Sequence, residues 1–121
     1  MKVYIGIDGD RVGEKIEALI VAGNLQKVAA LSRKVQFAIK KLEDTIISSG
    51  GRVIFSGGDS ILAEIELDEQ QCDNLVRMFH DITGCTASAG IGNTPIEAYL
   101  ALKLAKGSDS EKVIVFRSGS K

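Results

Sequence analysis

Two aspartates lie at positions where folding alone does not require a carboxylate. Asp59 borders the Gly-Gly turn in VIFSGGDSILAEIEL, residues 53–67, and Asp8 ends the apolar run KVYIGID, residues 2–8. A lone aspartate in a turn or before a helix is usually structural. Two aspartates held close together instead share a proton or bind a hard cation, and oxygen ligands with an open side suit Mg²⁺ or Mn²⁺. The metal interpretation therefore requires that Asp8 and Asp59 meet.

A second feature points to phosphate. The segment GIDGDRVG, residues 6–13, places glycines on both sides of Asp8 and Asp10, after an expected strand and before an expected helix. Such a turn presents backbone N–H groups to an anion. A metal on one side and an anion-binding turn on the other would together fit a nucleoside triphosphate. The chain contains no G-x-x-x-x-G-K-[ST] motif, which excludes a P-loop.

The composition is that of one globular domain without a strong charge. The chain has 121 residues, of which 45% are hydrophobic and 26% charged, and its net charge is −1. A large nucleic-acid surface needs clustered basic residues, so we expect no stable nucleic-acid partner. Cys72 and Cys85 have no metal-type spacing, which is typical of reduced thiols. With no visible signal peptide and no apolar stretch long enough for a bilayer, we expect a cytoplasmic protein without membrane association.

Hydrophobic spacing and turn residues predict nine elements in the order β-α-α-β-β-α-β-α-β. The expected strands cover residues 2–8, about 52–56, 60–67, 85–91 and 112–116, and the expected helices follow Asp10, Leu25, Asp68 and Thr94. Asp68 with Gln71, and Thr94 with Glu97, have the spacing of capping boxes. The helix after Thr94 has proline at its first position and should end at Lys106, before Gly107.

Without one helix and the last strand, this order is the ferredoxin-like split β-α-β pattern. It predicts an α+β fold with a mixed, largely antiparallel sheet and helices packed on one face. The first and third strands of such a sheet are central neighbours. The end of the first strand then lies beside the turn between the second and third. Asp8 points away from Val3, Ile5 and Ile7, so it should face the open side and converge with Asp59.

Four segments, in this order and on these elements, resemble one family. YIGIDGD, FSGGDS, TASAGIG and AYLALKLAKG are similar to the nucleotidyltransferase palm shared by GGDEF cyclases and the polymerase subunit of type III CRISPR complexes. The resemblance runs from residue 2 to about 116, and the short chain resembles most the stand-alone minimal CRISPR polymerase family. We therefore expect a single palm-type nucleotidyltransferase domain over residues 1–117 and a flexible tail over 118–121.

The resemblance implies a palm-type site with two divalent ions, Mg²⁺ or Mn²⁺. Asp8, Asp59 and the backbone carbonyl of Gly9 would hold the ions. Asp10 matches a second acid of the first-strand motif and would either bind metal or cap the helix. The triphosphate would lie on the amides of the turn DRVG, at Asp10, Arg11 and Val12.

Other positions carry over to the nucleotide. Gly57 and Gly58 would keep bulk away from it, or serve the turn alone. Lys106 matches the lysine that reaches the β- and γ-phosphates in GGDEF cyclases, although a lysine also suits a helix C-terminus. Lys103, one turn earlier, is a weaker candidate. Ser60 departs from the family pattern, because GGDEF and GGDD motifs carry a second acid there.

The implied activity joins nucleoside triphosphates, ATP before others, into a cyclic di- or oligonucleotide with release of pyrophosphate. The resemblance further suggests antiviral signalling through a separate effector protein that reads the product. A cyclic dinucleotide needs two attacks in opposite senses, so we expect a homodimer with facing sites. Two alternatives stay open. Ser60 favours a catalytically inactive palm that senses a nucleotide, and a ferredoxin-like interaction module without nucleotide is disfavoured by the intact acids.

Overall fold

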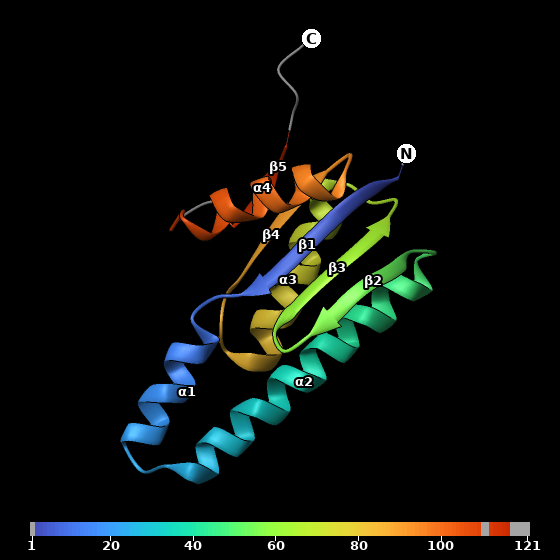
Figure 1. The fold of residues 1–121 in the computed structure, drawn as a ribbon. Coiled ribbons are helices and arrows are strands. Elements are labelled where there is room, and N and C mark those ends of the chain that lie inside the picture. Colours follow the sequence, from blue (N-terminus) through green and yellow to red (C-terminus); the bar gives the residue numbers. More distant parts are fainter. Residues whose placement is uncertain (1, 110–111, 117–121) are drawn as a thin grey trace.

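The computed structural model describes residues 2–109 and 112–116. Five strands form one sheet with four helices around it, in the expected order (Figure 1). The elements are β1 (Val3–Gly9), α1 (Val12–Val21), α2 (Leu25–Ser48), β2 (Arg52–Gly57), β3 (Ser60–Ile65), α3 (Glu69–Thr83), β4 (Ala87–Gly92), α4 (Pro95–Lys106) and β5 (Val113–Val115). The expected tail over 118–121 lies outside the described residues.

The strand order is β2-β3-β1-β4-β5, and the pairs are antiparallel except for β4 with β5. The predicted mixed, largely antiparallel α+β palm is therefore confirmed. β1 is central, and Asp8 near its end pairs with Ser60 on β3 and with Ser88 on β4. The register places the β2–β3 turn beside the end of β1, as expected.

One face of the sheet carries the main core. Helices α2 and α3 pack against this face and against each other (Figure 1). Strand residues with alternating apolar side chains, such as Ile5, Ile7 and Ile61, are buried there. Leu42 of α2 and Phe79 of α3 are fully buried against them. The alternation that predicted strands therefore also marks this face.

The prediction that all helices pack on one face is wrong. Helix α4 lies on the opposite face, over β4 and β1 (Figure 1). A side chain at Gly90 would overlap the backbone of Leu102 and Ala98 in α4, and one at Gly6 would touch the Leu102 side chain. Because these strand positions lack side chains, the helix packs directly on the sheet backbone. The face that carries Asp8 is thus partly covered.

The helix ends agree with most of the predicted caps. Asp68 and Gln71 form the expected capping box on α3. Thr94 accepts a hydrogen bond from the N–H of Glu97. The carboxylate of Glu97 accepts from the N–H of Asn93, one residue before the cap, so the predicted box at Thr94 is not closed. Three strands are shorter than expected, since β3 ends at Ile65, β4 begins at Ala87 and β5 covers only Val113–Val115.

Helices α1 and α2 form a hairpin that extends beyond the end of the sheet (Figure 1). Among the apolar residues of α1, Val12 is buried, while Ile16 and Leu19 are half-buried. Ile20 is exposed, because it lies in the part of the hairpin that extends beyond the sheet. No helix in residues 2–109 and 112–116 is long and apolar enough to cross a bilayer.

Candidate active site

The structure brings Asp8 and Asp59 together at the end of β1. The N–H of Gly9 donates to the backbone oxygen of Asp59 over 2.9 Å, which fixes the turn against the strand. A Cβ on Gly9 would lie 3.1 Å from Asp59 Oδ2, so that carboxylate lies against this glycine. Burial raises the pKa of Asp59, and the charge of Asp8 raises it further. Two carboxylates that repel each other create a site for a cation.

Ser60 takes part in this corner although it is not an acid. Its hydroxyl donates to Asp8 Oδ1 over 2.6 Å, and the two residues pair directly across β1 and β3. The hydroxyl therefore orients Asp8 and leaves its other oxygen, Oδ2, to a cation. In place of a further carboxylate, the chain has a donor that holds the first one.

The ammonium group of Lys106 lies among three oxygens of β1 and the following turn. Its Nζ is 3.1 Å from Asp8 Oδ2, 3.2 Å from Asp10 Oδ1 and 3.0 Å from the Gly9 carbonyl oxygen. Burial disfavours the charged lysine, but hydrogen bonds and attraction from Asp8 and Asp10 outweigh this and raise its pKa. The lysine therefore compensates the charge of the acids.

Asp10 is held by four side chains and does not cap a helix. It accepts hydrogen bonds from Ser88 and Thr86, both over 2.8 Å, in addition to its contacts with Lys106 and Lys112. Burial opposes its ionisation, but the hydrogen bonds and the charge of Lys106 prevail and lower its pKa. The carboxylate is therefore a fixed anion at the centre of a polar cluster.

Three residues of this cluster were missed by sequence reasoning: Thr86, Ser88 and Lys112. Ser88 is fully buried, and its side chain lies on the same sheet face as Asp8. The signal available was the polar alternation within TASAG, where threonine and serine are two residues apart. Nothing in the sequence placed Lys112 near Asp10, because their contact joins the two ends of the chain.

The turn after β1 leaves the start of α1 open. Arg11 is the N-cap and has φ 56°, a left-handed conformation that costs a non-glycine residue energy. No side chain among the described residues caps this helix. The side chain of Val12 is buried, so it can offer a ligand only its amide. The first N–H groups of α1 thus stay available to an anion.

The remaining predicted positions lie around this corner with different roles. Lys103 has its ammonium 5.3 Å from the centre of the Tyr99 ring, away from the acids. Gly58 has φ +58° in the turn, a conformation that favours glycine, with open space where a side chain would be. A side chain at Gly57 would touch the ring of Phe55.

The donor set at the end of β1 fits a hard divalent cation. Asp8, Asp59 and the Gly9 carbonyl provide oxygen ligands only, which Mg²⁺ and Mn²⁺ prefer, with the remaining positions left to water and phosphate. In the part of the chain that the structure describes, no three His, Cys, Asp or Glu side chains form a closed metal site.

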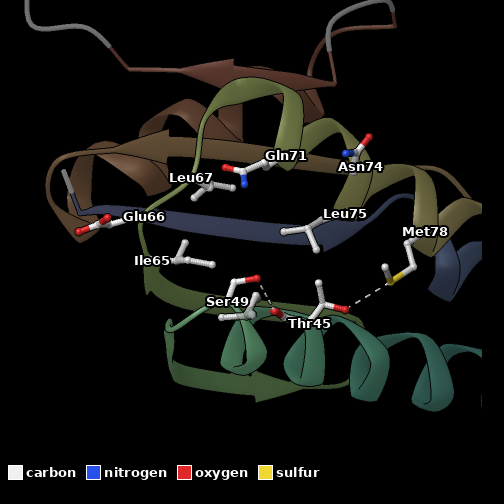
Figure 2. A pocket seen from close by; sticks show the side chains of 10 residues that line it. Thr45, Ser49, Ile65, Glu66, Leu67, Gln71, Asn74, Leu75 and Met78 are labelled. Carbon is white, nitrogen blue, oxygen red and sulfur yellow. Dashed lines mark hydrogen bonds between the residues drawn. The ribbon is translucent and has the colours of Figure 1, made fainter.

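A separate pocket of about 170 Å³ lies between α2 and α3 (Figure 2). It is lined by residues near the far end of β3, such as Ile65, which pairs with Val3 and not with the Asp8 end of β1. Its hydroxyls serve the structure, since Thr45 donates to the Lys41 carbonyl and Ser49 to that of Thr45. We assign the chemistry to the end of β1.

Solved structures share this fold. A chain of a Csm1–Csm4 cassette in complex with cA4 matches with a TM-score of 0.69 and 23% identity, over 97% of this chain and 21% of that chain. The GGDEF domain of DgcB from Caulobacter crescentus, in complex with c-di-GMP, matches with a TM-score of 0.63 and 15% identity, over 97% and 78%. The active GGEEF domain of a diguanylate cyclase from Vibrio cholerae matches with a TM-score of 0.62 and 14% identity, over 98% of this chain and 84% of that chain.

The fold is the palm fold of these structures, with an acidic corner at the end of β1. The chain spans 21% of the length of the cassette chain that it matches, and no curated protein gives a significant match. The family model of the minimal CRISPR polymerase domain matches residues 4–116. The chain belongs to this family.

Proposed function

We propose that the domain is a nucleotidyltransferase that joins nucleoside triphosphates into a cyclic di- or oligonucleotide. The observation that carries this proposal is the convergence of Asp8 and Asp59 beside the uncapped start of α1. A ribose hydroxyl oxygen would attack an α-phosphate, the bond between the α- and β-phosphates would break, and pyrophosphate would leave. Membership of the minimal CRISPR polymerase family supports this reaction class.

The chain's own residues would divide the work as follows. Asp8, Asp59 and the Gly9 carbonyl would hold divalent ions, Mg²⁺ or Mn²⁺, whose Lewis acidity would activate the hydroxyl and stabilise the leaving group. The amides at the start of α1 would bind phosphate oxygens. Lys106 would move from the acids to the phosphates, since both are anionic partners within reach of one side chain. Asp10 would keep Lys106 in place before the substrate arrives.

A pocket next to the same corner would take the base. It measures about 290 Å³ and is bordered by α1, α2 and the β2–β3 turn, with Ser32 and Gln36 as polar residues of α2. An amide side chain can donate to one adenine nitrogen and accept from its amino group, so Gln36 would be able to bind the adenine of ATP. The test is a competition of ATP with GTP in the wild type and in Gln36→Glu, which can only accept and should lose the preference for ATP.

Assembly follows from the size of the domain. One metal corner cannot direct two attacks in opposite senses, so two copies would face each other across a two-fold axis. Exposed apolar side chains on the same face, Phe55 of β2 with Tyr99 and Leu104 of α4, are available for such a contact. Mixing inactive Asp8→Asn protein into the wild type should reduce activity more than dilution does. A strictly proportional loss would contradict the dimer.

The product would act as a signal in antiviral defence and be read by a separate effector protein. The family name and the cA4 ligand of the Csm1–Csm4 structure support this extension. The chain itself would need no effector for synthesis. Purified domain with ATP and Mg²⁺ should therefore form product alone.

A second function is favoured by one observation, the serine at position 60 in place of a second acid. A palm that lacks this acid could bind nucleotides or cyclic nucleotides as a sensor without reacting. Incubation with each NTP and Mg²⁺ or Mn²⁺, followed by a pyrophosphate assay and chromatography, separates the two. Pyrophosphate above the level of an Asp59→Asn control supports the enzyme, and tight binding without pyrophosphate supports the sensor.

A further inference from the structure

Lys112 forms a second cationic contact with the acid cluster. Its Nζ lies 3.3 Å from Asp10 Oδ2 and 3.5 Å from Ser88 Oγ. Lys106 approaches the other oxygen of the same carboxylate, Asp10 Oδ1, over 3.2 Å. Two ammonium groups from the C-terminal part of the chain therefore flank one aspartate that follows β1.

Asp10 does not need Lys112 for its own stability. Both of its oxygens already accept hydroxyl hydrogen bonds of 2.8 Å, from Ser88 and Thr86, and Lys106 supplies an opposite charge. The contacts of Lys112, at 3.3 and 3.5 Å, are longer than the 2.7–2.9 Å typical of a strong charge-assisted bond. The ammonium is held loosely and can be drawn to a ligand.

The side chain of Lys112 starts from a fixed point. The N–H of Ala89 donates to the Lys112 carbonyl over 2.7 Å, which attaches this residue to β4. The side chain is 27% exposed and lines a pocket of about 330 Å³ that it shares with Arg11 and Lys106. Asp10 and Asp109 also border the pocket, and Lys106 pairs with Asp8 as well. Three cationic side chains that converge on one pocket can bind an anion with several charges once it displaces these carboxylate contacts.

We propose that Lys112 binds the terminal phosphate of the bound nucleoside triphosphate, together with Arg11. This inference rests on the proposed function. Lys106 contacts both Asp8 and Asp10, whereas the contacts of Lys112 are with Asp10 and Ser88. With the reacting α-phosphate at Asp8 and Asp59, the polyphosphate would pass Lys106 and end at Lys112. Lys112 is thus a binding residue that senses the length of the phosphate chain.

The test compares ligands of different phosphate length. Lys112→Ala is titrated calorimetrically in the presence of Mg²⁺ with α,β-methylene-ATP, inorganic tripolyphosphate and AMP. A lost contact between a charged donor and a phosphate should weaken the first two ligands by about 10- to 100-fold and leave AMP unchanged. Lys40→Ala is the matched control, because its ammonium pairs with Asp44 on the exposed side of α2 and does not line the pocket. It should bind all three ligands like the wild type.

Two results would overturn the inference. Equal weakening of AMP and the triphosphate analogue would show that Lys112 acts only by orienting Asp10, and unchanged binding of all ligands would show no role. If Lys112→Ala lowers the melting temperature, Lys112→Gln replaces it, since glutamine keeps a donor for Asp10 without the charge. A wild-type protein that binds none of the ligands refutes the proposed function itself, whereas a binding wild type with an insensitive variant refutes only the role of Lys112.

Discussion

The two faces of the sheet differ in what lies between strand and helix. On the core face, a layer of large side chains, among them Ile7, Leu42 and Phe79, separates the strands from α2 and α3. On the site face, α4 rests on Gly6 and Gly90 with no such layer. The first arrangement buries apolar area, and the second brings the end of α4 within reach of the β1 backbone. The hydrophobic core that stabilises the fold and the proposed site therefore lie on opposite faces of the sheet.

The acids at the end of β1 give the largest expected effect. Asp8→Asn and Asp59→Asn should each lower product formation about 10³-fold or more, because a lost ligand removes charge stabilisation worth several kcal/mol at the transition state. The melting temperature should stay level or rise, since burial and the charge of Asp8 already disfavour ionised Asp59. Pyrophosphate release measures the activity, and thermal unfolding measures the melting temperature. A variant with near-normal turnover would refute the two-carboxylate site.

Gly90 tests whether the site face depends on direct backbone contact. Gly90→Ala should destabilise the protein by about 3 kcal/mol or more, since its Cβ would overlap backbone atoms of α4 that cannot move aside. Gly13→Ala is the matched control. Its Cβ meets nothing within 4 Å, so alanine in α1 should stabilise by up to about 1 kcal/mol. Denaturant unfolding measures both, and equal stabilities would contradict the packing of α4 described here.

Lys106 links the packing of α4 to the acidic corner, because it is the last residue of α4 and its ammonium contacts the end of β1. Lys106→Ala should raise the KM for the triphosphate about 10- to 100-fold through loss of one charged contact. It should also tighten Mn²⁺ binding in the absence of nucleotide, because Asp8 and the Gly9 carbonyl lose their competing partner. Steady-state kinetics and Mn²⁺ titration are the measurements. An unchanged KM would assign Lys106 to the end of the helix alone.

The smallest effect is expected on the core face, where a buried cysteine should hardly react with a thiol reagent. Burial raises the pKa of the Cys72 thiol to about 12, and this residue is fully buried. At pH 8 the reactive thiolate is therefore absent, and iodoacetamide should leave Cys72 unmodified in the folded protein. Mass spectrometry should detect modification only in guanidinium chloride. Rapid labelling of the native protein would mean that the core face opens as readily as the site.

The sequence predicted the core face well and the site face in part. Alternating residues such as Ile5 and Ile7 carry a hydrophobic period, so the strands and their order along the chain could be inferred. The ferredoxin-like pattern led us to expect every helix on one face, and Gly90, which has no side chain, gave no signal that α4 packs on the other. The meeting of Asp8 and Asp59 followed from topology. The contact between Lys112 and Asp10 could not, because it depends on where β5 joins the sheet.

The glycine and alanine contact between β4 and α4 restricts how the family can vary. Ala98, Ala101 and Ala105 are fully buried on the inner side of α4, and any larger residue there would lift the helix from the strand. One added methyl group at this contact between β4 and α4 would therefore displace Lys106 at the end of the helix. Drift in sequence should therefore collect on the outer side of α4, at positions such as Leu100 and Leu104. The glycine and alanine residues between β4 and α4 therefore determine how far Lys106 extends toward the end of β1.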